Sequence, residues 1–353
     1  MANHPLPDPV RIGWRGALPA LDQGRLLARV SAQHRAGYEL HDGAHEFNAQ
    51  PAPHFLKRGL EPDQRPAVGD FVVVESGTPP HIVEILPRRG ALTRAAAGER
   101  YARQIIASNI DVVLVLMGLD EDFNPARAER YLALIEGSGA QPVIVLSKPD
   151  KLGPDDVAVA SAQLQARLPA ATPLHAINGK DAGSVAALDA YLQPGTTAVL
   201  VGSSGAGKST LTNTLLGELR MATATTRNDG RGRHTTVHRA LLMLPSGACL
   251  IDTPGMRELK LTGEENLEVF ADIDALAAQC RFADCGHGNE PGCAVHAALD
   301  SGELDAARFR HYLKLRGEHE AQAAQIEERI RAQDQRKPAG REPRHFIRDR
   351  DRR

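Results

Sequence analysis

The stretch that decides the fold is Gly202-Ser203-Ser204-Gly205-Ala206-Gly207-Lys208-Ser209, a complete GxxxxGK[ST] phosphate-binding loop. An apolar run at residues 198–201 precedes it, and a helical pattern at 210–216 follows and ends at Gly217. A buried strand, a glycine-rich turn and a helix form the context that this motif requires. The glycines let consecutive backbone N–H groups surround a polyphosphate, and the helix N-terminus adds a favourable partial charge. The sequence therefore predicts a nucleoside triphosphate site.

Each residue type in this loop has a chemical role. The Lys208 ammonium reaches the β and γ oxygens of the nucleotide, and the Ser209 hydroxyl would hold Mg²⁺. The expected contacts of the loop with the nucleotide come from Gly202, Ser203, Ser204, Gly205, Ala206, Gly207, Lys208, Ser209 and Thr210. The alternative is a Gly/Ser-rich loop that only resembles the motif, but the strand, the Lys-Ser pair and the Gly217 stop argue against it.

The length and the charge of the chain limit its number of domains and its class of partner. Its 353 residues suggest two or three domains, because single cores seldom exceed about 250 residues. The 42 Lys and Arg against 44 Asp and Glu give a net charge of -2, so any basic surface must be local. No apolar run approaches the roughly 20 residues that cross a bilayer, and the N-terminus lacks a signal pattern. We expect a cytoplasmic protein with no membrane partner.

The N-terminal third reads as a leader and a small β-domain. Residues 1–22 are rich in Pro and Gly and are interpreted as a flexible or loosely packed leader. Over residues 23–100, short β-like runs separated by Gly, Pro and Asp predict a small β-barrel. It has few aromatic residues for stacking on single strands, so backbone or shape contacts to nucleic acid are favoured. The alternative is a structural barrel that only orients its neighbours.

A basic connector leads out of this barrel. Its arginines predict either contact with phosphate or a solvated face, and the pattern does not separate the two. They are Arg88, Arg89, Arg94, Arg100 and Arg103.

An α/β domain is expected over residues 101–265. It starts with the β-branched run 109–117, which is typical of a parallel strand buried on both faces. A helix should follow over 125–136, with Asn124 as its cap and Pro125 at its first position, and then a strand at 142–146.

That second strand ends in Ser147-Lys148-Pro149-Asp150, which resembles the Asn-Lys-x-Asp motif with which GTPases read guanine. The Asp150 carboxylate can accept the ring N–H and the exocyclic amine of guanine, an amine that adenine lacks, and the stem of Lys148 can lie across the base. Ser147 keeps a hydroxyl but loses the two-ended amide of Asn. Another strand is expected to end near residues 174–179, where GTPases carry a loop that packs against the base, and Ala176 is the matching residue. A plain turn is the alternative for both segments.

Two nucleotide-sensing segments are expected after the phosphate loop. The polar, glycine-containing stretch 225–237 suits a switch loop in which Thr235, or its neighbour Thr236, ligates Mg²⁺ and bonds the γ-phosphate. The strand at 249–252 then ends in Asp-x-x-Gly, with Asp252 on the Mg²⁺ shell and the Gly255 N–H on the γ-phosphate. A mobile surface loop is the alternative for the first stretch.

A cluster of three thiols and one imidazole marks the C-terminal part. Cys280, Cys285, His287 and Cys293 suit a closed tetrahedral Zn²⁺ site, and ordinary buried cysteines are the alternative. Beyond it we expect one or two helices, interrupted near Gly317, within a mostly helical domain over residues 266–330. From residue 329 to 353 there are ten Lys and Arg against four Asp and Glu, so residues 331–353 are interpreted as a basic tail, disordered until it meets RNA or simply solvated.

With the base-reading motifs first and the phosphate loop and switches after them, the chain resembles a circularly permuted GTPase. Together with the barrel and the zinc cluster, it is similar to the ribosome small-subunit-dependent GTPase A family. Its most specific motifs are Arg231-Gly232-Arg233-His234-Thr235-Thr236 and Asp252-Thr253-Pro254-Gly255. The resemblance implies that the barrel is an oligonucleotide-binding (OB) fold. It also implies that the protein binds GTP and GDP and acts late in maturation of the small ribosomal subunit, which binds it through ribosomal RNA and stimulates GTP hydrolysis.

Slow intrinsic turnover is expected of the chain alone. Many GTPases carry a water-orienting Gln after Asp-x-x-Gly, where this chain has Met256. His234 is the candidate substitute, because an imidazole on a switch loop can bond the attacking water. The equal alternative is that His234, with Arg231 and Arg233, only contacts RNA phosphate. The predicted catalytic set is therefore His234, Thr235, Asp252, Gly255 and Lys208.

Two rival functions come from other classes. A small-molecule kinase would need a substrate pocket and a catalytic base, for which the sequence offers no candidate. An RNA-binding scaffold whose nucleotide site only senses GTP is opposed by the intact Lys208, Ser209 and Asp252. We expect a monomeric GTPase.

Overall fold

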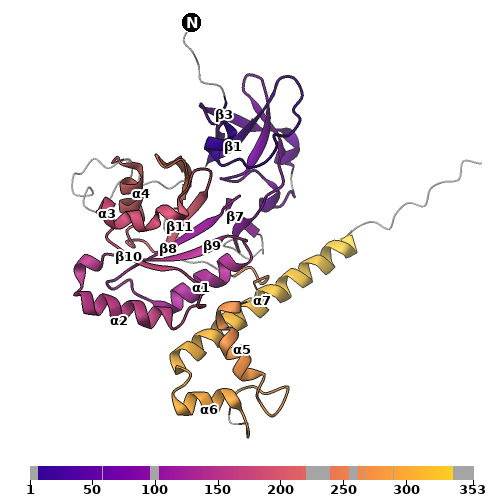
Figure 1. Cartoon of the computed structure of the whole chain (residues 1–353). Helices are drawn as coiled ribbons and strands as arrows, with labels where there is room; N and C mark the ends of the chain where they lie inside the picture. The colour runs from indigo at the N-terminus through magenta and orange to yellow at the C-terminus, as the bar shows by residue number, and fades with distance from the viewer. Residues whose placement is uncertain are drawn as a thin grey trace, which may run out of the picture.

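The computed structural model describes residues 7–57, 59–95, 103–219, 239–253, 261–265, 267–288 and 290–336. Figure 1 shows three parts in chain order: a β-barrel coloured indigo, a central sheet with helices on both faces, and C-terminal helices coloured orange to yellow. No helix in these ranges combines the length and apolar character that crossing a membrane requires.

The predicted small β-barrel is confirmed. Its strands are β1 (Arg25–His34), β2 (Gly37–His41), β3 (Glu46–Pro51), β4 (Phe71–Glu75) and β5 (His81–Ile85). They pair in the order β1-β2-β3-β5-β4, and β4 pairs back with β1, which closes the circuit. Short 3-10 helices at Pro53–Leu56 and Pro62–Gln64 lie between β3 and β4. Five strands closed in this way agree with an OB-fold, and that assignment stays a prediction.

The described parts of the basic connector form strands, which the sequence did not indicate, and Arg100 lies outside the described residues. Strands β6 (Ala91–Ala95) and β7 (Arg103–Ser108) pair antiparallel as a separate two-stranded ribbon. Arg88 makes a two-pronged ion pair with buried Asp70, at 2.6 and 2.7 Å, and Arg103 pairs with Glu264. These two guanidinium groups therefore pair with carboxylates of the chain itself. The Arg103 side chain is still 38% exposed, and contact of the connector with phosphate stays a prediction.

The α/β sheet follows the predicted order of strands and helices. Its strands are β8 (Val112–Gly118), β9 (Gln141–Ser147), β10 (Leu174–Ile177), β11 (Thr197–Gly202), β12 (Ala240–Met243) and β13 (Cys249–Asp252). The spatial order is β10-β9-β8-β11-β13-β12, with all neighbours parallel except β12. Every residue of β8 and β11 is buried, because helices cover both faces of the sheet.

Alternate residues of β8 face two separate cores. Val113 and Val115 pack with the helix α1 (Pro125–Glu136), whereas Leu114 and Leu116 pack with α4 (Lys208–Leu216). The helix α2 (Pro154–Gln165) lies on the α1 side, and α3 (Ala182–Val185), continued by a 3-10 turn at Ala186–Tyr191, lies on the α4 side. The predicted cap of α1 is confirmed, since the Asn124 side chain accepts the Arg127 N–H at 3.2 Å.

The leader is not loose from Asp8 onward. Residues Pro9–Ile12 form a 3-10 helix, and Ile12 is fully buried beside Leu27 and Phe71. Next to it, the fully buried Arg29 donates to three carbonyl oxygens and one hydroxyl, which belong to Gly69 (3.0 Å), Ile12 (2.7 Å), Asn109 (3.0 Å) and Thr197 (2.8 Å). One guanidinium therefore joins the leader, the barrel and the strand β11 that feeds the phosphate loop.

The barrel and the α/β domain share a sheet. Barrel strand β1 pairs antiparallel with β12, with Ala32 opposite Ala240, so eleven strands form one hydrogen-bonded sheet. The orientation of the barrel on the α/β domain is therefore set by backbone hydrogen bonds as well as by Arg29.

The C-terminal part is helical, as predicted, but its last helix is continuous. It comprises α5 (Ala271–Ala277), preceded by a 3-10 turn at Glu268–Phe270, then α6 (Ala294–Ser301) and α7 (Ala306–Arg336). The expected interruption near Gly317 was wrong, because one glycine weakens a helix by only about 1 kcal/mol and good helix formers surround it. The helix also runs through residues 331–336, the beginning of the segment interpreted as a tail.

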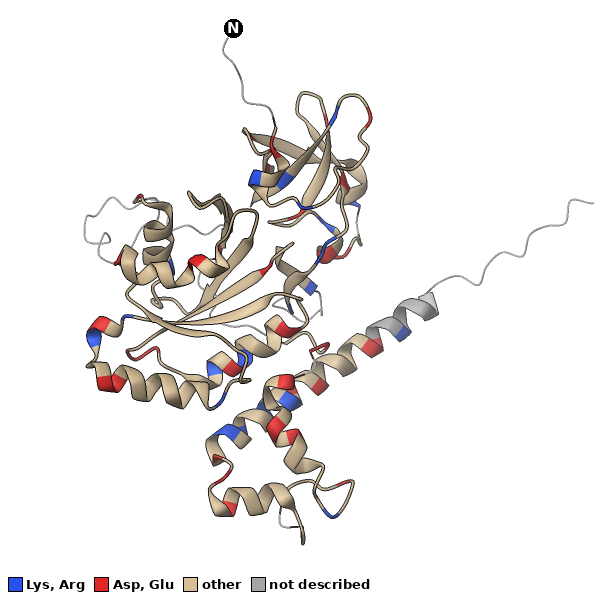
Figure 2. Cartoon of the chain, viewed as in Figure 1, with Lys and Arg blue, Asp and Glu red and all other residues tan. Residues whose placement is uncertain are grey.

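Helix α7 is attached to α1 by charged side chains. Glu129 of α1 is fully buried and accepts from Arg308 (2.9 Å) and His311 (2.8 Å), while Arg167 lies 3.5 Å away. About two turns further along α7, Glu318 makes a two-pronged pair with Arg130. Figure 2 shows acidic and basic positions on both helices where they approach each other, whereas the central strands carry almost no charge. The C-terminal helices are therefore held on the α1 face of the sheet.

Candidate nucleotide site and metal cluster

The phosphate loop has the geometry that its sequence predicts. It leaves β11 at Gly202 and enters α4 at Lys208, and Gly205 and Gly207 have φ of 91° and 97°. A Cβ atom on Gly202 would lie 2.4 Å from the Leu116 carbonyl oxygen of the neighbouring strand β8. The glycines are therefore needed for backbone conformation and for close packing of the loop on the sheet.

Lys208 is buried inside this loop. Its ammonium donates to the carbonyl oxygens of Gly202 (2.8 Å) and Ser203 (2.6 Å). Burial lowers the pKa of Lys208, and the carboxylates of Asp252 and Asp122 act in the opposite direction. The loop thus holds one positive charge at the centre of its curve, where a polyphosphate would bind.

Asp252 provides the matching carboxylate. It ends β13 beside Leu200 of β11, and its Oδ1 is buried without a hydrogen-bond partner among the described residues. Burial raises the pKa of Asp252 to about 6, although Lys208 and the Thr253 N–H lower it. An oxygen that is buried and unpaired is the kind of ligand Mg²⁺ takes. The residues present therefore fit Mg²⁺, with the half-buried Ser209 at the start of α4.

The predicted base-reading segment lies beside the phosphate loop. Ser147 ends β9, and its hydroxyl donates to the Ala206 carbonyl oxygen of the phosphate loop at 2.6 Å. The Ser in place of Asn therefore still ties the two loops together. Lys148 takes a left-handed φ of 62°, and Pro149–Lys151 form a 3-10 turn that leaves Asp150 exposed. Asp150 is thus accessible to a base.

The other predicted base contact lies at the same edge of the sheet. Ala176 is exposed near the end of β10, opposite Leu146 of β9. The Thr214 hydroxyl of α4 donates to the Gly179 carbonyl oxygen at 2.6 Å and ties this loop to the helix after the phosphate loop. The carboxyl ends of β8, β9, β10, β11 and β13 meet here, and open α/β sheets bind ligands at such edges. The structure brings these predicted residues together.

Three predicted site residues and one neighbour lie outside the described residues. They are His234, Thr235, Gly255 and Met256.

Sequence reasoning missed the loop after β8. Asp120 accepts from the amines of Lys148 (2.7 Å) and Lys151 (3.0 Å), and Asp122 accepts from the hydroxyl of Ser203. The sequence shows that these carboxylates directly follow a fully buried strand, which is the available signal. It does not show that the carboxyl end of this strand borders both the predicted base-reading loop and the phosphate loop.

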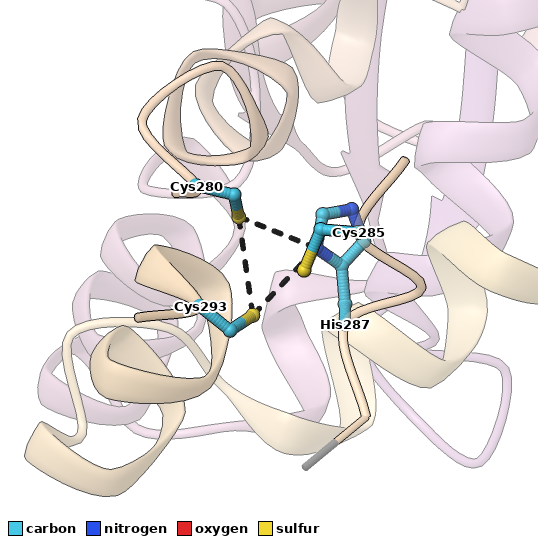
Figure 3. Close-up of side chains that lie close together, drawn as sticks. All are labelled: Cys280, Cys285, His287 and Cys293. Atoms are coloured by element: carbon cyan, nitrogen blue, oxygen red, sulfur yellow. Dashed lines mark hydrogen bonds between the residues drawn. The ribbon is translucent and has the colours of Figure 1, made fainter. Parts of the chain in front are cut away.

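The predicted metal ligands converge on one point, as Figure 3 shows. The ligand atoms of Cys280, Cys285, His287 and Cys293 all lie within 4.8 Å of one another. The Cys280 sulfur is 3.9 Å from the Cys293 sulfur and 3.6 Å from Nδ1 of His287, which is itself 3.7 Å from the Cys293 sulfur. Tetrahedral Zn²⁺ would separate two sulfurs by about 3.8 Å and a sulfur from a nitrogen by about 3.6 Å. The cluster fits a four-coordinate metal ion.

Backbone N–H groups support these ligands. Cys293 caps α6, and its sulfur accepts the His296 N–H at 3.3 Å. Desolvation acts to raise the pKa of Cys280, but N–H groups of Val295 and Ala294 outweigh it, so this pKa is lowered. These effects favour thiolates at Cys293 and Cys280, the form that binds metals. At Cys285 the His287 N–H lowers the pKa, but desolvation and the neighbouring Cys293 and Cys280 thiols outweigh it and raise the pKa to about 11.

Comparison with known proteins gives matches over most of the chain. A family model described as RsgA GTPase matches residues 85–262. A second model, described as ABC transporter, matches residues 185–346, a range that also contains the phosphate loop. Such loops occur throughout nucleoside triphosphatases, so the second match is explained by the loop.

Two curated relatives carry the name small ribosomal subunit biogenesis GTPase RsgA. The protein of Xanthomonas axonopodis pv. citri (strain 306) is 52% identical over 340 residues, which cover 95% of this chain and 92% of the relative. The protein of Xanthomonas campestris pv. campestris (strain B100) is 51% identical over 335 residues, which cover 94% of this chain and 90% of the relative.

Solved structures share the fold. YjeQ from Thermotoga maritima has a TM-score of 0.59 and 24% identity, with 82% of this chain and 97% of that chain covered. YloQ, described as a circularly permuted GTPase, has a TM-score of 0.56 and 23% identity, with 86% of this chain and 98% of that chain covered.

Proposed function

The chain belongs to the RsgA GTPase family, and from this premise we propose that it hydrolyses GTP as a late biogenesis factor of the small ribosomal subunit. The subunit, binding through its ribosomal RNA, would stimulate the hydrolysis.

The observation that carries this proposal is the bond between Ser147 and Ala206. This bond joins the turn that contains Asp150 to the phosphate loop, which supports one nucleotide reaching both. Asp150, exposed on that turn, would accept two N–H groups of guanine. Adenine lacks the second of these donors, so this site would favour GTP over ATP.

The phosphate loop, Asp252 and the switch segment, which lies outside the described residues, would bind the triphosphate and its metal ion. The loop N–H groups and Lys208 would hold the β and γ phosphates, and Ser209, Asp252 and, on the switch segment, Thr235 would hold Mg²⁺. Mg²⁺, when bound with GTP, supplies positive charge that stabilises the developing negative charge. Thr253 keeps Asp252 in place, because its hydroxyl donates to the Leu200 carbonyl oxygen at 2.6 Å.

Two further roles are proposed outside the described residues. The Gly255 N–H would contact the γ-phosphate. His234 would orient the attacking water once the small subunit binds, since Met256 cannot do so. Without the subunit, hydrolysis would be slow.

The parts of the chain outside the GTPase domain would bind the small ribosomal subunit. One Zn²⁺ at Cys280, Cys285, His287 and Cys293 would be structural, since four protein ligands leave no open position. The barrel over 23–100, as an OB-fold, the zinc-binding domain over 266–330 and the basic segment 331–353 would contact ribosomal RNA. The barrel would precede and the other two parts would follow the GTPase domain of 101–265 in a cytoplasmic, monomeric protein.

The test compares GTP and ATP turnover with and without purified small ribosomal subunits. We expect GTP hydrolysis that the subunit stimulates by at least about tenfold, and little ATP hydrolysis. Lys208→Ala should abolish the stimulated turnover.

The outcomes separate the rival functions. Subunit binding that depends on GTP without stimulated turnover would favour the RNA-binding scaffold that only senses GTP. ATP turnover at a comparable rate would contradict the proposal.

A further inference from the structure

The loop between β8 and α1 contains a carboxylate that holds two lysines of the base-reading turn. One oxygen of Asp120 accepts from Lys148 at 2.7 Å and from Lys151 at 3.0 Å. The Lys148 and Asp120 side chains are about one-quarter exposed, at 27% and 23%, whereas Lys151 is 54% exposed. The Lys148 pair is therefore the better shielded of the two and the less weakened by salt.

Asp120 is ionised over the whole physiological range. Burial acts to raise its pKa, but the hydrogen bonds from Lys148 and Lys151 outweigh burial and lower the pKa to about 2. Its other oxygen accepts the Asp122 N–H at 3.2 Å, and Asp122 in turn binds Ser203 of the phosphate loop. The carboxylate is thus held from both sides.

The backbone is shaped to allow this contact. A Cβ atom at Gly118 would lie 2.5 Å from Oδ1 of Asp120 and 3.3 Å from Nζ of Lys148. Lys148 itself has a left-handed φ of 62°, which is unfavourable for a residue with a side chain. The unfavourable backbone conformation therefore occurs at Lys148, the residue whose ammonium binds Asp120.

We propose that Asp120 is a positioning residue for the guanine nucleotide, which acts by fixing the ammonium end of Lys148. This inference rests on the proposed function, in which the stem of Lys148 lies across the base. A side chain with four methylenes loses rotamer entropy when it is ordered. Asp120 orders it before the nucleotide arrives, so less of this loss falls on binding.

The role predicts a definite pattern among nucleotides. With its stem across the base, Lys148 would contact neither the γ-phosphate nor the polar edge of guanine. Loss of Asp120 should therefore weaken GTP, GDP and the hypoxanthine nucleotide IDP by the same factor, and leave turnover at saturating GTP unchanged. Loss of Asp150 should instead change the preference for guanine over hypoxanthine.

The experiment measures affinities of fluorescent GDP, and of GTP and IDP by competition, for the full-length protein. Asp120→Asn, which keeps the size and removes the charge, should weaken all three by about tenfold. Asp120→Ser provides a second variant for the same measurement if Asp120→Asn fails to fold. Thermal unfolding of each variant without nucleotide shows whether it is folded. The matched control is Glu121→Gln, which removes the adjacent exposed carboxylate and should change affinity less than twofold.

A double-mutant cycle tests the route through Lys148. In a Lys148→Met background, Asp120→Asn should have an effect of less than about twofold, whereas in a Lys151→Met background it should keep most of its effect. An unchanged affinity of D120N, a full effect in the K148M background, or a loss confined to kcat would overturn the inference. Failure of the wild-type protein to bind guanine nucleotides would instead contradict the proposed function.

Discussion

Ionisation of the Asp252 carboxyl group is unfavourable in the folded protein without a metal ion. Its folded pKa is raised to about 6, and an unfolded Asp ionises near pH 4. Between these values the folded state binds more protons than the unfolded state, so the free energy of unfolding falls as pH rises through this window and stays low above it. Asp252→Asn cannot ionise, so at pH 8 we expect this variant without nucleotide to be more stable by about 1–3 kcal/mol.

Chemical denaturation followed by circular dichroism at pH 4, 6 and 8 measures this difference. The gain should be near zero at pH 4, and the same variant should lose at least about tenfold of its turnover with Mg²⁺ and GTP. Asp189→Asn is the control, because Asp189 is exposed. A variant that is less stable than wild type at pH 8 would contradict the explanation.

Ser147 gives a second test at this scale. Ser147→Ala would leave the Ala206 carbonyl oxygen without the hydroxyl that bonds it at 2.6 Å, and the two nucleotide loops would lose a direct link. We expect GDP affinity to fall by roughly three- to tenfold, as for one buried hydrogen bond. The control is Ser161→Ala, whose hydroxyl bonds the Val157 carbonyl oxygen within α2. Equal affinities in both variants would show that this bond does not support binding.

At the same scale, the sequence predicted the residues whose role follows from their own motif and not those whose role follows from a neighbour. Lys208, Asp150 and the four metal ligands could be named from spacing. Asp120 could not, because its role depends on Lys148, which lies 28 positions later in the chain and meets it only when β8 and β9 pair.

At the scale of elements, the contact between α1 and α7 depends on Glu129. This buried carboxylate serves two guanidinium groups and one imidazole, so Glu129→Gln removes the buried counter-charge that they share. Arg308 keeps its pair with Asp272 and Arg167 keeps its pair with Asp305. We expect the free energy of unfolding to fall by about 2–4 kcal/mol. Glu318→Gln breaks a pair on the same two helices that is about one-quarter exposed and should lower it by less than about 1 kcal/mol. Equal losses in chemical denaturation would contradict the central role of Glu129.

Whether a segment forms a helix or a strand was predictable where a single sequence pattern continues along the whole segment. The helix α1 was expected at 125–136 and found there, because a cap, a proline and an apolar stripe agree. The ribbon of β6 and β7 was missed, since its arginines suggested a surface connector. Helix α7 was expected to break at Gly317, but the chain on both sides favours helix more than one glycine opposes it.

At the scale of the whole molecule, the metal cluster and the nucleotide site should be separable. Cys285→Ser removes one of four ligands and should reduce bound zinc from one equivalent to less than about 0.2, with α5 and α6 becoming sensitive to limited proteolysis. GDP affinity should stay within about twofold, because no residue of the cluster contacts the described nucleotide loops. Cys249→Ser, the control, should keep its zinc, since Cys249 lies on β13. Loss of GDP binding together with zinc would contradict this separation.

The order of the motifs along the chain predicted the permuted domain, but not how the barrel is joined to it. The barrel interpretation depended on local strand and turn patterns, which short sequences carry. The junction depends on Arg29, whose partners come from four segments of the chain, and on pairing between β1 and β12. No local pattern encodes contacts of such separation.

The same guanidinium has a consequence for the order in which the newly made chain can fold. Arg29 emerges early in synthesis, but Thr197 follows 168 residues later, and Ala240, opposite Ala32, later still. The barrel strands are complete by residue 85, yet until Thr197 is available one donor of a fully buried arginine lacks its acceptor. The N-terminal part therefore reaches its final state only after more than half of the chain has left the ribosome, and it has to wait for the phosphate-loop strand to finish folding.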